Sequence, residues 1–169
     1  MKTTFIAAGD SFITRRIPEA GYPGFNELKA LVESHDVRFV NLESTFHDQE
    51  GYPAATSGGT WAMSDPRTLD DICRMGFNFF NTANNHSGDF GQGGIVATIK
   101  HLRERDMVFA GTGMTLQDAS RAAYLETAEA RVALIGIIVE NSESTAQLNA
   151  LLHDAGQYII GRMGLPYRA

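Results

Sequence analysis

The feature that most constrains the fold is a regular alternation of short apolar segments with segments of helical periodicity. Strand-like apolar segments cover residues 3–8, 37–42, 77–82 and 107–110. Between them, apolar side chains recur at helical spacing over residues 25–34, 64–76 and 93–105. Such an alternation is typical of a layered α/β domain, in which helices flank a mostly parallel sheet. We therefore expect an α/β fold, and a chain of 169 residues is long enough for one such domain.

The other segments carry weaker signals. Residues 45–64 are rich in Gly and Pro and show no period, which predicts a long loop of the kind that often serves a function. Residues 115–123 are expected to form a short helix, with Thr115 as its N-cap and Asp118 three residues later. The C-terminal part is expected to form a hairpin (124–127 with 131–139) and then a helix (141–152), with no clear prediction from residue 158 onward.

Composition and charge exclude several classes of protein. Lys and Arg number 14 against 20 Asp and Glu, which gives a net charge of −6, so general binding to nucleic-acid phosphates is not expected. The longest apolar run, residues 132–139, is far shorter than the ~20 residues that cross a membrane. A single cysteine, Cys73, rules out an internal disulfide. No signal peptide or anchor is recognisable, so the expected compartment is the cytoplasm.

Three predicted strands end in side chains of the kinds that bind metal ions. Asp10 follows the first strand, Glu43 the second, and Asn84, Asn85 and His86 the third. Neighbouring strands of a parallel sheet lie ~5 Å apart, so these side chains are expected to converge. Carboxylates, an amide oxygen and an imidazole suit divalent ions such as Mn²⁺, Fe²⁺ or Zn²⁺. Two such ions ~3.5–4 Å apart can clamp a phosphoryl oxygen, so a site for one or two ions is expected.

Each of these residues also has an ordinary structural interpretation. Asp10 can belong to a turn after Gly9, Glu43 can cap a helix, and an Asn pair can form a turn. A lone His is more often a surface or hydrogen-bonded core residue than a ligand. On the pattern alone, both the metal or catalytic site and the set of turn residues stay open.

A few further residues are weaker candidates. Arg15 and Arg16 either face an anionic substrate or form a solvated pair, and Trp61 either lines a substrate or fills a loop. His47, four residues after Glu43, is a weak site candidate. The glycine-rich turns lack the spacing of phosphate-binding loops, and the chain has no GxSxG elbow for a nucleophilic Ser.

Four segments carry a resemblance to a known family. They are AAGDSFITRR (7–16), VRFVNLEST (37–45), LDDICRMGFNFFNTANNHSGDFGQGGIVATIKHL (69–102) and VFAGTGMTLQDASRAAYLE (108–126). In these segments, which span about residues 4–140, the chain resembles the CapA family of bacterial capsule-synthesis proteins, called PgsA in poly-γ-glutamate producers. The ANNH-x-x-D-x-G-x-x-G run is the most specific part of the match. The resemblance implies a calcineurin-like metallophosphoesterase fold, a layered α/β sandwich with a two-metal site.

The resemblance also implies roles for individual residues. Asp10 corresponds to the metal-binding aspartate of the first strand, and Glu43 stands where related phosphoesterases have a second, bridging carboxylate. Asn85 and His86 resemble the Asn-His pair in which Asn binds a metal and His protonates the leaving group or steadies the transition state. His86 is also counted among the metal-site residues, and Asp89 would orient it.

The chain departs from the family in two ways. Family members are about twice as long and carry further histidines in their second half, so residues 1–169 are expected to be a single metallophosphatase domain that lacks its C-terminal half. The membrane anchor of the polyglutamate-export members is also absent. The expected function is a capsule or poly-γ-glutamate biosynthesis protein with a metal-dependent hydrolase site, acting on a phosphoester or an anionic polymer. The alternatives are a non-catalytic subunit for assembly or export of such a polymer, and a fragment that forms a homodimer through an exposed sheet edge.

Overall fold

The computed structural model describes residues 2–57, 59–137, 139 and 142–160. Its centre is a four-stranded parallel sheet with the strand order β1-β2-β5-β6. The strands are β1 (Phe5–Ser11), β2 (Val37–Leu42), β5 (Phe79–Asn81) and β6 (Phe109–Ala110). A helix connects each strand to the next, as parallel pairing requires. The predicted α/β fold with a mostly parallel sheet is confirmed.

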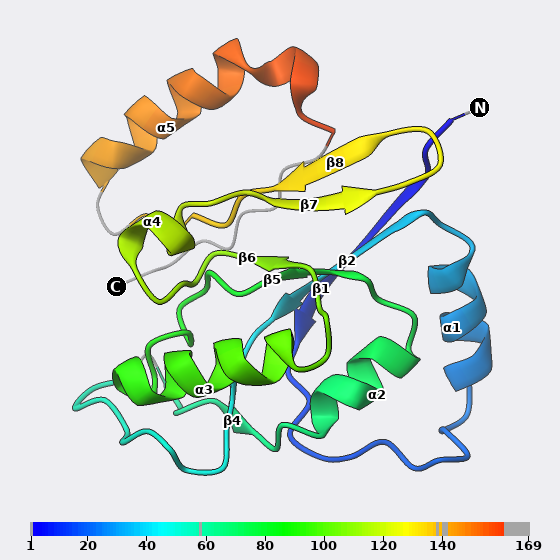
Figure 1. Ribbon diagram of the computed structural model, residues 1–169, viewed down its shortest axis with the longest axis vertical. Coiled ribbons are helices and arrows are strands. Elements are labelled where there is room, and N and C mark those ends of the chain that lie inside the picture. The colour runs from blue at the N-terminus through cyan, green and yellow to red at the C-terminus, as the bar shows by residue number, and fades with distance from the viewer. Residues whose placement is uncertain (1, 58, 138, 140–141, 161–169) are drawn as a thin grey trace.

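Three helices cover one face of this sheet (Figure 1). They are α1 (Phe25–Glu33), α2 (Thr68–Arg74) and α3 (Gly91–Arg103). Their inward side chains meet those of β2 and β5 in the larger core, which includes Val32, Val40, Leu42, Leu69, Ile72, Phe80 and Leu102. Each side chain of this size contributes about 1.5–3 kcal/mol when it is fully buried. This core fixes the strand ends that carry the polar residues.

A hairpin covers the opposite face of the sheet; the predicted pairing of its two strands is confirmed, but its second strand ends at Leu134, short of the predicted residue 139. Strands β7 (Ala123–Glu126) and β8 (Arg131–Leu134) pair antiparallel, and Val132 packs on Val37 and Phe79 of the sheet. The short helix α4 (Leu116–Ala119) precedes the hairpin, and the N-cap prediction is confirmed because the Thr115 hydroxyl accepts a hydrogen bond from the Asp118 N–H. Helix α5 (Ser142–Asp154) lies beyond the hairpin in Figure 1. The arrangement is consistent with part of a metallophosphatase-like fold.

Strand β1 runs further than the sequence predicts. A register shift between Ala7 and Asp10 lets the strand rejoin β2, so that Asp10 pairs with Asn41. A local irregularity of this kind bends a strand and redirects the side chains that follow it. Asp10 therefore lies inside a strand, and its interpretation as a turn residue is wrong.

The prediction of a continuous loop over residues 45–64 is also wrong at both ends. Strands β3 (Thr45–Phe46) and β4 (Met63–Ser64) form a two-stranded parallel sheet. The pairing is anchored by the side chain of Phe46, which is fully buried in the larger core. The intervening segment is thus a closed loop whose ends meet beside Glu43, and the sequence pattern misses this because each strand has only two residues.

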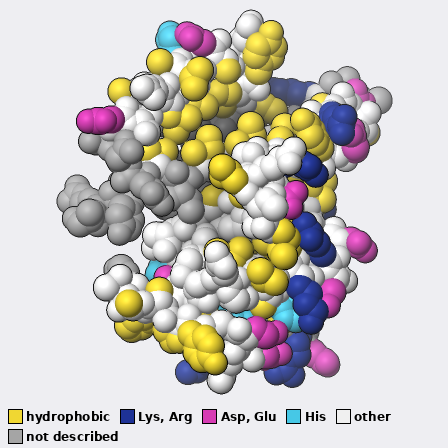
Figure 2. Space-filling model, turned by 60° about the vertical axis from the view of Figure 1, so that its left-hand side comes forward, with side chains coloured by type: hydrophobic (Ala, Val, Ile, Leu, Met, Phe, Trp, Pro, Cys, Tyr) yellow, Lys and Arg dark blue, Asp and Glu magenta, His cyan; other side chains and the backbone are white. Residues whose placement is uncertain are grey.

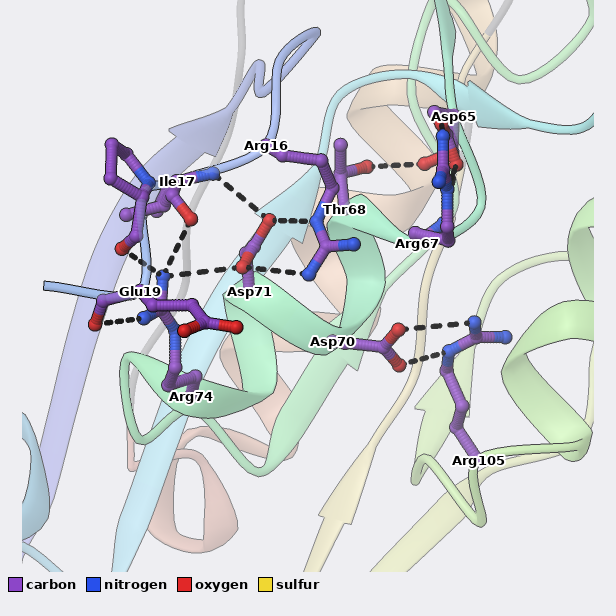
Figure 3. Close-up of polar contacts among 11 residues, drawn as sticks. Arg16, Ile17, Glu19, Asp65, Arg67, Thr68, Asp70, Asp71, Arg74 and Arg105 are labelled. Atoms are coloured by element: carbon purple, nitrogen blue, oxygen red, sulfur yellow. Dashed lines mark hydrogen bonds and ion pairs between the residues drawn. The ribbon is translucent and has the colours of Figure 1, made fainter. Parts of the chain in front are cut away.

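Figure 3 shows how the segment that follows β1 is tied to α2. Arg16 Nε donates to Asp71 Oδ2 at 2.6 Å, and the Ile17 N–H donates to the same oxygen at 3.0 Å. Arg74 donates to the carbonyl oxygens of Ile17, Pro18 and Glu19 at 3.0 Å. Arg16 is exposed and pairs with Asp71, so it has a structural partner, and its contact with an anionic substrate stays a prediction.

Exposed apolar side chains gather on the part of the molecule that holds the hairpin and α5, as Figure 2 shows from one side. They include Tyr124, Ile135, Ile137, Leu151, Tyr158 and Ile160. Among the described residues, none of the helices has the length and apolar character needed to span a membrane.

Candidate functional site

Two carboxylates meet at the carboxyl ends of β1 and β2. The side chain of Asn41 lies between them: its Nδ2 donates to Asp10 Oδ1 at 2.8 Å and also to Glu43 Oε2. Glu43 immediately follows β2 and is buried, whereas Asp10 is exposed. The predicted convergence of Asp10 and Glu43 is what the structure shows.

The amide of Asn41 is fully hydrogen-bonded. Its Oδ1 accepts from Asn81 Nδ2 at 2.7 Å and from Asn84 Nδ2 at 3.3 Å, while its NH₂ group serves the two carboxylates. An Asn side chain has two donors and two acceptor positions, so all four are used. The side chain is only 2% exposed, which means that water does not compete for these bonds.

An imidazole lies beside Glu43, one of these two carboxylates. His86 Nε2 lies 4.0 Å from Glu43 Oε1, and His86 Nδ1 lies 2.7 Å from Asp89 Oδ2. Because a carboxylate can only accept, Nδ1 carries the proton of this hydrogen bond and Nε2 is left to face Glu43. The ring of Phe12 packs edge-on against the imidazole, with the centroids 5.9 Å apart. The predicted partnership of Asp89 with His86 is present.

Asp89 is itself held by the loop that closes over it. Its Oδ2 accepts from the Ala62 N–H at 2.6 Å, and its carbonyl oxygen accepts from the Ala54 N–H at 2.8 Å. Asp89 is buried, so its carboxylate has a fixed position relative to the imidazole. The loop between β3 and β4 thus contributes to the site through its backbone.

Asn85 is the predicted site residue that the structure does not bring into this network. Its side chain is exposed and forms no hydrogen bond with any residue that the structure describes. The preceding residue, Asn84, is the buried one: its Nδ2 donates to the Leu42 carbonyl oxygen at 2.7 Å, and its Oδ1 accepts from the His86 N–H at 3.0 Å. The role of Asn85 as a metal ligand stays a prediction.

The environment of Glu43 opposes its ionisation. Burial raises the pKa of Glu43, and the nearby Asp10 carboxylate raises it further, against the lowering effects of His86 and the Asn41 amide. Two carboxylates this close repel each other when both are charged, and a bound cation would relieve that repulsion.

The donor set fits a divalent ion in part. The carboxylates of Asp10 and Glu43 supply two hard oxygen ligands of the type that Mn²⁺ and Mg²⁺ prefer. Within the described part of the chain, no group of three or more His, Cys, Asp or Glu side chains is placed to hold a metal ion. The two carboxylates are therefore the only part of the predicted ligand set that the described residues bring together through shared hydrogen bonds.

The weaker candidates His47 and Trp61 have partners other than Asp10, Glu43 and His86. His47 is buried against Phe90, with ring centroids 4.6 Å apart, and its Nδ1 accepts from the Gln49 N–H at 3.1 Å. Burial lowers the pKa of His47. Trp61 donates its indole N–H to the Ala54 carbonyl oxygen at 2.9 Å and so fastens the loop.

Sequence reasoning missed Asn41 and Asn81. Both lie at the ends of central strands, two residues on from a phenylalanine of the same strand face. A polar amide at a position where the strand pattern calls for an apolar side chain was the signal that could have revealed them.

A family model described as "Bacterial capsule synthesis protein PGA_cap" matches residues 4–158. The chain belongs to this family. The match of the PGA_cap family spans every residue of the site, from Asp10 to Asp89.

Curated relatives have similar sequences over most of this chain. The uncharacterized proteins y4sH and y4uA of Sinorhizobium fredii are each 39% identical over 135 residues, or 78% of this chain and 29% of their own length. The capsule biosynthesis protein CapA of Bacillus anthracis is 27% identical over 143 residues, or 80% of this chain and 34% of its own length. The chain thus spans about a third of the length of the curated relatives it matches.

Proposed function

We propose that this CapA-like chain carries one side of a metal-dependent hydrolase site of the phosphoesterase type, used in the biosynthesis of a capsule polymer such as poly-γ-glutamate. The observation that supports this most directly is the carboxylate pair of Asp10 and Glu43, in which Glu43 lies 4.0 Å from the Nε2 atom of His86. The name of the relative CapA supports capsule biosynthesis as the process.

In this proposal Asp10 and Glu43 hold a divalent ion, and Asn85 is a further ligand. When bound, the ion would polarise the phosphoryl oxygen of a phosphoester, or the carbonyl of an amide in an anionic polymer. The partners are accordingly an anionic polymer or a phosphoester, and the ion is Mn²⁺, Fe²⁺ or Zn²⁺.

His86 is the proton donor in this scheme. Its Nδ1–H points to Asp89, so the ring is fixed and Nε2 is the nitrogen that faces the reacting groups. In the imidazolium form Nε2 carries a proton that it can deliver to the leaving group, while the Asp89 carboxylate stabilises the charge. Burial of Asp89 and its bond from the Ala62 N–H keep the pair aligned.

One observation favours a second candidate function. The described residues hold no group of three or more His, Cys, Asp or Glu side chains placed for a metal ion. A non-catalytic subunit for assembly or export of an anionic polymer would need no such group. In that case the hydrogen bonds among Asp10, Asn41 and Glu43 would stabilise the fold, and the chain would hydrolyse no substrate.

The two functions are separated by Mn²⁺ binding and by hydrolysis of bis-p-nitrophenyl phosphate. We expect the wild-type chain to bind Mn²⁺ and to release nitrophenol, and Asp10→Asn to lose both properties. The matched control is Asp36→Asn, because Asp36 joins β1 to the start of β2 at the opposite end of the sheet through its bonds from Thr4. A wild-type chain that neither binds Mn²⁺ nor gains stability from it would contradict the hydrolase and favour the subunit.

A further inference from the structure

A ladder of three amides, of which Asn41 and Asn84 are buried and Asn81 is half-buried, links the elements that carry the site. Asn41 on β2 accepts from Asn81 on β5 and from Asn84 in the turn that follows. Asn81 Nδ2 also donates to the Ala83 carbonyl oxygen at 2.9 Å, which fixes the start of that turn. The ladder therefore spans β1, β2, β5 and the turn that leads to His86.

We propose that Asn41 is the positioning residue of the site, and that Asn81 and Asn84 act through it to set the spacing between the two carboxylates and the imidazole. This inference rests on the proposed function, because the positioning serves the proposed metal and proton donor. The hydrogen bonds that carry it are present whether or not a metal binds. Asn41 donates to both carboxylates from one NH₂ group. Asn84, which donates to Asn41, also accepts a hydrogen bond from the His86 N–H and so ties the backbone of His86 to Asn41.

The direction of the Asn41 amide follows from its partners. Asp10 and Glu43 offer oxygens, whereas Asn81 and Asn84 present their NH₂ groups to it. Only an amide with its NH₂ toward the carboxylates satisfies all four contacts. Two partial positive hydrogens thus lie between two carboxylates, where they hold the carboxylates together against repulsion.

The segment that follows β8 packs against Asn81 of the ladder at Gly136. A Cβ atom added to Gly136 would lie 2.6 Å from Asn81 Oδ1 and 2.8 Å from the Gly111 Cα. Both distances are shorter than van der Waals contact, so the chain after β8 approaches Asn81 as closely as only glycine permits. Gly136 gives a way to disturb the ladder without touching a carboxylate.

The ladder has a matched control at the other end of the same strands. Asn78 also joins β2 to β5: its Oδ1 accepts from the Arg38 N–H at 2.9 Å, and its Nδ2 donates to the Asp36 carbonyl oxygen at 3.0 Å. Loss of Asn78 removes comparable interstrand hydrogen bonds but touches no site residue.

The first experiment needs no metal. In ¹H–¹⁵N NMR spectra of the full chain, Asp10→Ala and Glu43→Ala should each shift the side-chain NH₂ signals of Asn41, and Asp36→Asn should not. Asn41→Leu should shift the backbone N–H signal of His86, whereas Asn78→Leu should leave it in place. Unmoved Asn41 signals in both carboxylate variants would overturn the proposal.

The second experiment measures Mn²⁺ affinity. Residues that orient metal ligands typically account for 10- to 100-fold in metal affinity, so we expect Asn41→Leu to weaken the Kd for Mn²⁺ by about that factor. Asn78→Leu should leave the Kd unchanged. Equal weakening in both variants would mean that Asn41 only joins strands, and the proposal would be wrong.

Two further results keep the proposal testable. If Asn41→Leu does not fold, Gly136→Ala takes its place, with a weakened Kd and shifted Asn41 signals as the expected result and wild-type values as the contradicting one. If the wild-type chain binds no Mn²⁺ while the NMR shifts occur as expected, the proposed hydrolase fails and the positioning role of Asn41 stands.

Discussion

Replacement of Asp71 tests the contact that anchors the chain after β1. The side chain of Asp71 is 2% exposed, and it accepts hydrogen bonds from Arg16 Nε at 2.6 Å, the Ile17 N–H at 3.0 Å and Arg74 Nη2 at 3.3 Å. Asp71→Asn keeps the shape and an acceptor for Ile17 but removes the charge. Asp71→Ala removes every acceptor.

The expected costs follow from these contacts. Hydrogen bonds to a charged group contribute about 1.5–3 kcal/mol each when buried, so Asp71→Asn should lower the free energy of unfolding by about 2 kcal/mol. Asp71→Ala also leaves the Ile17 N–H without an acceptor, whereas Arg74 keeps its bonds to the carbonyl oxygens of Ile17, Pro18 and Glu19. An unsatisfied buried donor costs about 1–3 kcal/mol, so the loss should exceed that of Asp71→Asn by about this amount. The comparison variant is Asp65→Asn: its carboxylate is 32% exposed and its partner Arg67 is 68% exposed, so this pair should contribute less than the contacts of Asp71.

The pH dependence gives a second check on the same residue. Burial alone would raise the pKa of Asp71, but the hydrogen bonds from Arg16 and the Ile17 N–H lower it further than burial raises it. A carboxyl group with a lowered folded-state pKa stabilises the fold above its unfolded pKa of about 3.9 and loses this contribution as the pH falls through the folded value. The difference between wild type and Asp71→Asn should therefore shrink below about pH 4.

Urea unfolding followed by circular dichroism at pH 7 and at pH 3.5 measures both effects. A loss of less than about 0.5 kcal/mol for Asp71→Ala at pH 7 would refute the reasoning, because it would mean that the buried carboxylate contributes no more than an exposed one. A difference that grows on acidification would refute the sign of the pKa argument.

Two further predictions concern the site and the core. Burial and Asp10 raise the folded-state pKa of Glu43, so ionised Glu43 destabilises the fold once the pH rises above its unfolded pKa. Glu43→Gln should therefore unfold at a higher urea concentration than wild type at pH 7 and show no gain below about pH 4. A lower urea midpoint for Glu43→Gln at pH 7 would contradict this. Phe46, fully buried where β3 meets α3, should cost about 3–5 kcal/mol when changed to Ala in the same urea assay, whereas Phe12→Ala, at a side chain that is 45% exposed, should cost far less; equal losses would contradict the assigned core.

The sequence predicts β2 well because this strand is apolar and buried on both faces. Strand β2 runs over Val37–Leu42 in the structure, as predicted, since the helices cover one side and the hairpin the other. The two-residue strands β3 and β4 were not predictable, because no period can be read from two residues. The extension of β1 to Ser11 depends on a register shift that only pairing with β2 reveals.

The candidate site was predictable as a set of strand ends but not as a network. Parallel strands bring Asp10, Glu43 and His86 to one edge, which the order of elements already indicates. The hydrogen bonds of Asn41 depend on side-chain rotamers and on the neighbours across three strands, which a linear pattern does not contain. For the same reason the sequence could not distinguish Asn84, which is buried, from Asn85, which is exposed.

The most direct test of the account compares His86→Ala with Asp10→Ala in the Mn²⁺-loaded chain. If His86 donates a proton and Asp10 holds the ion, His86→Ala should keep its bound Mn²⁺ while turnover of the phosphodiester falls by about 10²- to 10⁴-fold, and Asp10→Ala should lose the Mn²⁺. Equal loss of Mn²⁺ in the two variants would show that His86 is a ligand, and full turnover in His86→Ala would show that the imidazole takes no part in the reaction.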